Sequence, residues 1–270
     1  MISRIYSERE GHPDGPGSQK IRFRLAASLA SRPETGNVPR IFFRADDIGV
    51  PSRAFFRMMD LFVQFQVPLC LAVVPSWLTR PRWETMKPYW ERQSDLFCWH
   101  MHGWRHQNHE PMGKKHEFGP SQRNAHIDSD LERGMDRLKG IMGKRFSPVF
   151  TPPWNRCSAH TLNRLKALGF KAVSRDKGAK PPPIEDLYEF PVNVDLHTRR
   201  EQTAEQGWDK LFLEIQGALR SGTCGFMLHH MRMNDPAFDF LSELLSQVRE
   251  QPGVKRVNFD HLVDSKVTGP

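Results

Sequence analysis

Short apolar runs alternate with longer amphipathic segments along this 270-residue chain, and that alternation is the strongest constraint on its fold. The apolar runs read as strands, and they lie at residues 40–45, 67–75, 95–103, 147–153, 170–175, 189–196, 222–230 and 254–259. The amphipathic segments have helical spacing, and they lie at residues 52–65, 125–143, 158–169, 207–222 and 236–250. This order indicates βα units around a parallel sheet, with about the seven or eight units that a (β/α) barrel requires.

The alternation predicts one domain over residues 39–270, because neither an internal repeat nor a long linker divides that range. Residues 1–38 are expected to form an N-terminal extension, polar apart from a short amphipathic helix at residues 21–31. The polar segment at 103–124 is too long for an ordinary connection. Loops of that length in a compact domain usually carry function.

The composition is ordinary for a soluble globular protein, with 38% hydrophobic and 26% charged residues. The net charge of +8 would suit a nucleic-acid partner, but the basic residues are scattered. We find no helix-turn-helix, zinc-finger or RNA-recognition signature, so we expect no nucleic-acid partner. The first twenty residues lack an apolar signal core, and no stretch approaches the length of a membrane span. We therefore expect a cytoplasmic protein without a membrane partner; the sequence does not predict its oligomeric state.

Side chains capable of chemistry collect at the ends of the predicted strands. They are Asp46 and Asp47 after the first strand, His102 and His106 after the third, and His229 and His230 after a late one. Ligands of parallel α/β folds bind at the carboxyl ends of the strands. The sequence therefore predicts a functional site at this edge of the sheet.

The His102 and His106 pair predicts a metal site. Residues four apart share a face, so both rings can meet one ion if the chain turns helically between them. A carboxylate from another strand would complete a two-His, one-carboxylate site, so one of Asp46 and Asp47 is a predicted ligand. The other aspartate can then act as general base on a water activated by the metal. The alternative is a helix N-cap for the aspartates and a surface or capping role for the histidines.

From about Arg40 onward the sequence resembles a divergent branch of the polysaccharide deacetylase (NodB-homology) family, carbohydrate esterase family four. The motifs that carry the resemblance are "RADD", "HGWRH", "TPPWNR" and "MLHH". The resemblance implies a distorted (β/α)7-8 barrel that uses a divalent metal, commonly zinc, to remove N- or O-linked acetyl groups from sugars. It also implies that Asp46 is the catalytic base and that Asp47, His102 and His106 hold the metal.

Two motifs depart from the family pattern. Arg44 and Ala45 precede the paired aspartates, where the family has Thr or Ser followed by Phe. Thr151 stands where the family has an arginine that orients the base, and Arg123 or a lysine of the polar loop could replace that arginine. An alternative function therefore stays open: a catalytically impaired, carbohydrate-binding or regulatory protein that retains the metal site.

The expelled amine or alkoxide needs a proton, and a histidine at the end of a late strand can supply it. Strand alternation sends His229 and His230 to opposite faces, so only one can point into the barrel mouth. The family pattern Leu-x-His favours His229 as the catalytic acid, with Asp195 or His197 orienting it from the neighbouring strand.

The resemblance implies an acetylated sugar or oligosaccharide as the substrate, and we expect it to be soluble. Trp154, Arg123 and Asp195 are the predicted substrate contacts, and the indole of Trp154 could equally plug the barrel mouth. We expect His100, two residues before His102, to be a packed histidine and not a ligand.

Overall fold

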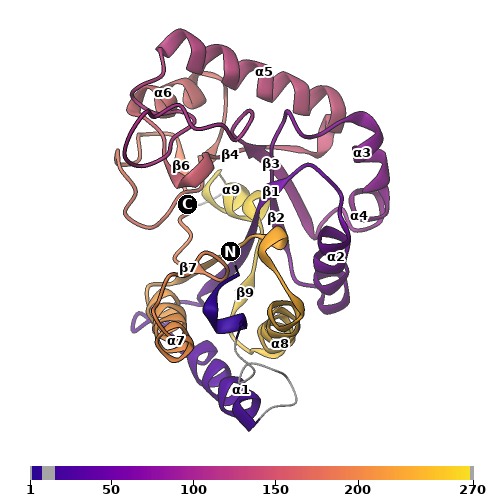
Figure 1. Ribbon diagram of the computed structural model, residues 1–270, viewed down its shortest axis with the longest axis vertical. Helices are drawn as coiled ribbons and strands as arrows, with labels where there is room; N and C mark the ends of the chain where they lie inside the picture. Colours follow the sequence, from indigo (N-terminus) through magenta and orange to yellow (C-terminus); the bar gives the residue numbers. More distant parts are fainter. Residues whose placement is uncertain (1, 8–15, 268–270) are drawn as a thin grey trace. The chain divides into compact units, whose positions relative to one another are not determined.

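The computed structural model of the chain describes residues 2–7 and 16–267 (Figure 1). Within that range the strands are β1 (Arg40–Ile48), β2 (Leu69–Val73), β3 (Phe97–His102), β4 (Phe146–Thr151), β5 (Ala172–Val173), β6 (Tyr188–Glu189), β7 (Val194–Asp195), β8 (Thr223–Leu228) and β9 (Lys255–Arg256). The α-helices are α1 (Pro16–Leu29), α2 (Arg53–Phe65), α3 (Arg80–Thr85), α4 (Lys87–Arg92), α5 (Asn124–Met142), α6 (Ala159–Ala167), α7 (Ala204–Arg220), α8 (Asp235–Glu250) and α9 (Phe259–Val267). Short 3-10 turns are η1 (Arg4–Tyr6), η3 (Gly143–Arg145), η4 (Pro153–Asn155) and η5 (His230–Arg232). The predicted alternation of strands and helices is confirmed.

The chain forms two compact units. The first consists of Met1–Ala45, Ser52–Leu69 and Asn193–Val257, and the second of Asp46–Pro51, Cys70–Val192 and Asn258–Pro270. The predicted division into an extension over residues 1–38 and a barrel domain over 39–270 stays a prediction.

In the second unit, the strands lie in the order β6-β5-β4-β3-β2. The pairs β3–β4, β4–β5 and β5–β6 are parallel. Helix α5 packs against β3, β4 and α6, and Figure 1 shows α5 beside α6. Phe150 of β4 contacts the rings of Phe118 and Phe170, which ties the polar loop to the strand layer. The carboxyl ends of β3 and β4 therefore lie at one edge, as parallel pairing requires.

In the first unit, β8 pairs in parallel with β1 and with β7, and β9 pairs with β1. Phe43 of β1 stacks on Phe226 of β8 with ring centroids 4.8 Å apart and meets Phe62 of α2 edge to face. Helix α7 packs against β7, β8 and α1, while α2 packs against α8. The hydrophobic core of this unit thus lies between its strands and helices.

One predicted strand is wrong. Residues 189–196 were expected to form a single strand, but they contribute to two short strands, β6 and β7, in different units. Pro191 lies between the two, and proline has no N–H to donate to a strand ladder. The apolar pattern alone did not reveal this break.

Two further boundaries differ from the sequence prediction. The short helices α3 and α4 lie in a segment for which no helix was predicted, and each has a proline in its first turn, where a missing N–H costs little. The last predicted strand, residues 254–259, is paired only at Lys255–Arg256, and α9 begins at Phe259. None of the helices within the described ranges combines the length and apolar character needed to cross a membrane.

Candidate metal centre

The two adjacent aspartates of β1 differ because the backbone turns at the second one. Asp47 has a φ of 62°, in the left-handed region, which Asp adopts more readily than most residues. This conformation interrupts the regular alternation of side chains along the strand. Asp46 is buried and Asp47 is half-buried, so the two neighbouring carboxylates have different surroundings.

His102 ends β3 and is held through one of its ring nitrogens. Its Nδ1 lies 2.9 Å from the carbonyl oxygen of Thr151, the last residue of the paired strand β4. A carbonyl can only accept a hydrogen bond, so Nδ1 carries the proton and donates it. In the neutral ring Nε2 therefore keeps its lone pair, and it lies 3.4 Å from Oδ1 of Asp47. Histidines that ligate metals are commonly oriented in this way.

His106 reaches the same carboxylate from an irregular segment. Its Nε2 lies 3.2 Å from Oδ1 of Asp47. The expected helical turn between the histidines is absent from this described segment, in which Gly103 and His106 have positive φ values of 62° and 57°. These two left-handed residues bring the rings together, with centroids 5.2 Å apart. The two rings therefore come together without the helical turn that the spacing argument took as its condition.

Asp47, His102 and His106 form a group suited to hold a metal ion. Their ligand atoms all lie within 4.8 Å of one another. Two neutral imidazoles and one carboxylate are a donor set that zinc and several other divalent metals accept, with positions left for water or substrate. The side chain of His102 is buried, while those of His106 and Asp47 are partly exposed, so the group can be reached from solvent.

The carboxylates act on the two ring pKa values in different ways. Burial acts to lower the pKa of His102, but the hydrogen bond to Asp47 and the charges of Asp46 and Asp47 outweigh it, so the pKa is raised. Burial and the neighbouring His102 lower the pKa of His106 despite the opposing charge of Asp47. His106 is therefore the ring that more readily loses its proton in the metal-free protein.

Thr151 supports the site without contributing a charge. Its carbonyl holds His102, and its hydroxyl lies 2.9 Å from Nε2 of His100. His100 is fully buried and meets the ring of Phe259 edge to face. His100 is thus a packed histidine, as expected.

Trp154 lies against the predicted ligand His106. The ring centroids of Trp154 and His106 are 4.5 Å apart, and Trp77 contacts His106 from 5.9 Å. Trp154 has a φ of 57°, which turns η4 sharply after β4. Nζ of Lys115 lies 5.9 Å from the centre of the Trp154 ring. Aromatic side chains and a lysine of the polar loop therefore surround the more exposed of the two histidines.

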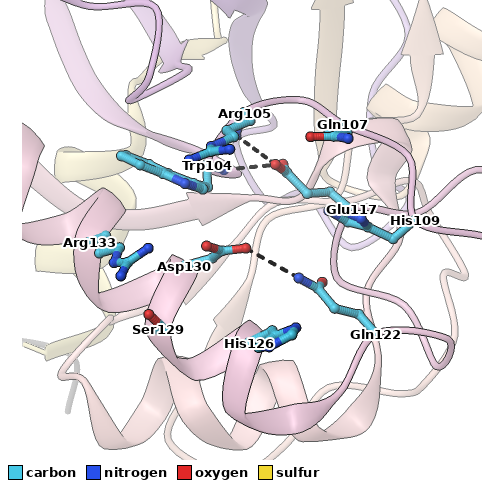
Figure 2. A pocket seen from close by; sticks show the side chains of 10 residues that line it. All are labelled: Trp104, Arg105, Gln107, His109, Glu117, Gln122, His126, Ser129, Asp130 and Arg133. Carbon is cyan, nitrogen blue, oxygen red and sulfur yellow. Dashed lines mark hydrogen bonds between the residues drawn. The ribbon is translucent and has the colours of Figure 1, made fainter.

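The polar loop is anchored by Glu117, whose carboxylate is buried. Its oxygens accept hydrogen bonds from the backbone N–H groups of Trp104 at 3.1 Å and Arg105 at 2.6 Å. Burial raises the pKa of Glu117, although these N–H donors act to lower it. Figure 2 shows the carboxylate directed at this backbone segment.

A polar pocket of about 380 Å³ separates the loop from α5 (Figure 2). Trp104, Arg105, Gln107 and Glu117 line it on the loop side. Asp130 and Arg133 line it on the α5 side. The segment that carries His106 thus contacts the metal group through His106 and this pocket through the residues on either side.

Arg123 lies at the N-cap position of α5, exposed, and its Nη2 lies 2.9 Å from Nε2 of His126. Glu117 holds the backbone of the segment that carries His106, whereas the guanidinium of Arg123 is engaged by a histidine of its own helix. The predicted roles of Arg123 as a substrate contact or as a replacement for the missing arginine stay predictions.

The predicted acid His229 belongs to the first unit and directly follows β8. Its backbone N–H donates to Nδ1 of His197 at 3.0 Å, so His197 holds the backbone of His229. His230 is buried and meets Phe55 of α2 edge to face, so it packs against the helix layer.

Asp195 forms a turn at the end of β7. One of its carboxylate oxygens accepts from the N–H groups of His197 and Thr198, both at 2.9 Å, and the other accepts from the Thr198 hydroxyl. These bonds occupy the carboxylate locally. Whether Asp195 also contacts substrate stays a prediction.

Solved structures show which proteins share this fold. A candidate polysaccharide deacetylase from Mycobacterium smegmatis matches with a TM-score of 0.63 and 15% identity, over 87% of this chain and 93% of that chain. A family 4 acetyl xylan esterase from Clostridium thermocellum, in complex with a cobalt ion, matches with a TM-score of 0.56 and 13% identity, over 84% and 92%. A CE4 family pseudoenzyme from Bacillus anthracis matches with a TM-score of 0.53 and 11% identity, over 87% and 68%.

The chain therefore has the fold of the polysaccharide deacetylases and CE4 esterases, and the predicted distorted (β/α)7-8 barrel is confirmed. The resemblance read from the motifs is confirmed at the level of the fold, since identities this low show the fold alone. No protein-family model matches the sequence, and no curated protein matches it either.

Sequence reasoning found the ligand candidates but not what positions them. A lone glutamate in a polar loop gives no pattern from which the anchoring role of Glu117 could be read. The sequence contains a weak signal for the positive φ of Gly103, because a glycine directly after the end of a strand often adopts such a conformation.

Proposed function

We propose that this protein is a metal-dependent hydrolase that removes acetyl groups from a carbohydrate. The single observation that carries the proposal is the group formed by Asp47, His102 and His106. A second carboxylate, that of Asp46, belongs to the residue next to Asp47. A fold shared with polysaccharide deacetylases and CE4 esterases supports the same reading. On this basis we assign the chain to a divergent branch of carbohydrate esterase family four.

Asp47, His102 and His106 would hold the ion, and we propose zinc, which favours nitrogen and oxygen ligands of this kind. The cobalt ion of the clostridial esterase supports a divalent metal without selecting zinc. When bound, such a cation supplies Lewis acidity, which makes water a stronger nucleophile near neutral pH.

Asp46 is the proposed base that takes a proton from the attacking water. It is buried at the end of β1, next to the ligand Asp47, so it can be near the reacting water without occupying a ligand position. His229 is the proposed acid that protonates the expelled amine or alkoxide. Ala45 and Leu228 are the last paired residues of β1 and β8, and Asp46 and His229 directly follow them.

The proposed substrate is an acetylated sugar or oligosaccharide, with Trp154, Arg123 and Asp195 as contacts. The ring of Trp154 beside His106 supports a sugar face at this position, because aromatic rings pack well against apolar faces. A cytoplasmic location and a soluble substrate, rather than an insoluble polymer, belong to the same proposal.

A specific observation favours a second candidate, a deacetylase-like protein with impaired catalysis. Thr151 replaces the expected arginine, and its hydroxyl and carbonyl are both engaged by histidines. This position therefore offers Asp46 no cation. A CE4 family pseudoenzyme from Bacillus anthracis shows that the same fold is compatible with lost activity.

Acetate release tests the proposal and separates the two candidates. The zinc-loaded protein is incubated with acetylated xylo-oligosaccharides and with N-acetylglucosamine oligomers, and acetate is quantified before and after treatment with a chelator. We expect release from at least one class, lost on chelation and recovered with zinc. A chain that binds one zinc ion yet releases no acetate would instead be the impaired protein. Release that chelation leaves unchanged would contradict the metal-dependent mechanism.

A further inference from the structure

Glu117 has a role beyond the proposed ligands, base and acid. Its side chain belongs to the polar loop, yet the residue is only 1% exposed. One oxygen accepts from the backbone of Trp104 and the other from that of Arg105. The backbone N–H of Gln107 also acts on this carboxylate, where it lowers the pKa.

These donors flank His106 on both sides. Trp104 and Arg105 directly precede it and Gln107 follows it, so the two hydrogen bonds of the carboxylate hold the segment that leads into His106. The segment belongs to neither a helix nor a strand, so its N–H groups need other acceptors. Glu117 supplies them, as Figure 2 shows for the first two donors.

The carboxylate fits closely against the turn between the two histidines. A Cβ added at Gly103 would lie 2.1 Å from Oε2 of Glu117 and 2.6 Å from Cγ of Pro153. Glycine at this position therefore leaves the space that the carboxylate occupies. The turn and its anchor depend on each other.

Glu117 is itself fixed to the core by the next residue. Phe118 is buried, forms an isolated parallel bridge with Cys157, and accepts a hydrogen bond from the N–H of Ser158 at 2.8 Å. Its ring packs against Phe150 of β4. The position of Glu117 is thus tied to β4, the strand whose last residue also orients His102.

We infer that Glu117 is a positioning residue that fixes the His106 segment through backbone hydrogen bonds and so sets the affinity of the site for its metal. This inference rests on the proposed function for the identity of the metal ligands. It goes further by assigning to the polar loop a role in forming the metal site.

The test compares Glu117→Gln with Glu110→Gln. Glu110 lies in the same loop, but its carboxylate bonds to Ser121 and not to the His106 segment. In Glu117→Gln, the amide NH2 faces backbone donors, so at least one hydrogen bond is lost. Zinc affinity, measured by competition with a chromophoric chelator, should fall about 10- to 100-fold in Glu117→Gln and change less than about twofold in Glu110→Gln.

Two further readouts separate positioning from general destabilisation. Amide hydrogen exchange of metal-free protein should speed up over residues 104–107 in Glu117→Gln, while α5 keeps its protection. The visible spectrum of the Co2+-loaded variant should change, because one ligand is no longer held in place. If Glu117→Gln does not fold, Glu117→Asp retains the charge with a shorter reach and should show the same changes in weaker form.

Equal zinc affinity in the wild-type protein and a folded Glu117 variant would overturn the inference, as would unchanged exchange over residues 104–107. A wild-type protein without affinity for zinc or Co2+ would instead contradict the proposed function, and the exchange measurement would still decide whether Glu117 anchors the segment.

Discussion

The backbone of Asp47 gives two neighbouring carboxylates different surroundings. Its left-handed backbone, with φ at 62°, lies within a strand that is otherwise extended. Its Oδ1 meets the Nε2 atoms of both histidines. A metal ion at this point would also reduce the repulsion between the adjacent acids. In the proposed function, the pairing of Asp46 with Asp47 places a base and a ligand side by side.

The first prediction separates these two aspartates. Asp46→Asn should keep about one metal ion per chain yet lose activity by a factor on the order of a hundred or more, as expected for a general base. Asp47→Asn should lose the ion, because the amide removes the negative charge from the group that faces both histidines. Metal analysis and acetate release on each variant check this. Loss of the ion in the first variant and retention in the second would reverse the roles.

A second prediction concerns the proton donor His229. Activity of the wild-type protein should follow a bell-shaped pH profile whose alkaline limb reports the acid. His229→Ala should remove that limb and keep the metal. The control is His230→Ala, which should lower thermal stability through lost packing on Phe55 but keep the profile. An inactive His230→Ala beside an active His229→Ala would show that the strand register was assigned wrongly.

The connections after β3 and β4 decide how the site is built at the scale of elements. The sequence predicted β3 and β4 because their apolar runs are unambiguous. The position of His102 at the end of β3 follows from that strand prediction. The shape of the HxxxH segment was not predictable, because it depends on Glu117, fourteen residues after Gly103 and brought close only by the fold. Sequence spacing predicts which residues share a face of a regular helix or strand, and this segment is neither.

Gly103 provides a third prediction, at the level of this turn. Gly103→Ala should lower the free energy of unfolding by roughly 1–3 kcal/mol and weaken zinc binding, because its φ is +62° and the new Cβ would meet Glu117 and Pro153. Gly140→Ala is the matched control, since Gly140 lies in α5 with nothing within 4 Å of an added Cβ. It should be neutral or stabilising by about 0.5–1 kcal/mol. Chemical denaturation of both variants measures the change in unfolding free energy. A Gly103→Ala protein as stable as Gly140→Ala would contradict the tight fit.

The fold of the molecule was largely predictable from alternating periodicity, because buried parallel strands and amphipathic helices leave clear patterns. Two-residue strands such as β5 and β7 are too short to show a period of their own, and Pro191 split a run that otherwise read as one strand. The motifs predicted the ligand candidates, since His102 and the aspartates lie at strand ends. The division into two units was not predicted, because the chain passes between the units within elements such as β1.

Acid stability is the fourth prediction. Burial, the neighbouring His229 and His230, and Arg232 lower the pKa of His197 to about 3. Nδ1 of His197 accepts a hydrogen bond from the His229 N–H, so a proton on Nδ1 would face another donor. The unfolded chain binds a proton at this residue near pH 6.5, before the folded one does, so stability is lost as pH falls from about 6.5 toward 3.

Between pH 7 and 5 the His197 contribution amounts to about 2 kcal/mol of unfolding free energy. His197→Asn retains an acceptor near the Nδ1 position but cannot titrate, so its unfolding free energy should fall less over the same interval. Urea unfolding at both pH values measures the difference between the two proteins. Parallel pH dependences would show that His197 is not the responsible group.

The central claim is that one divalent ion binds to Asp47, His102 and His106. The most direct measurement is anomalous diffraction at the zinc edge from crystals of the zinc-loaded protein. The account predicts one strong peak about 2.0–2.2 Å from Nε2 of His102, Nε2 of His106 and a carboxylate oxygen of Asp47, with Asp46 uncoordinated. A zinc peak coordinated by other residues, or none in protein that carries stoichiometric zinc in solution, would contradict it.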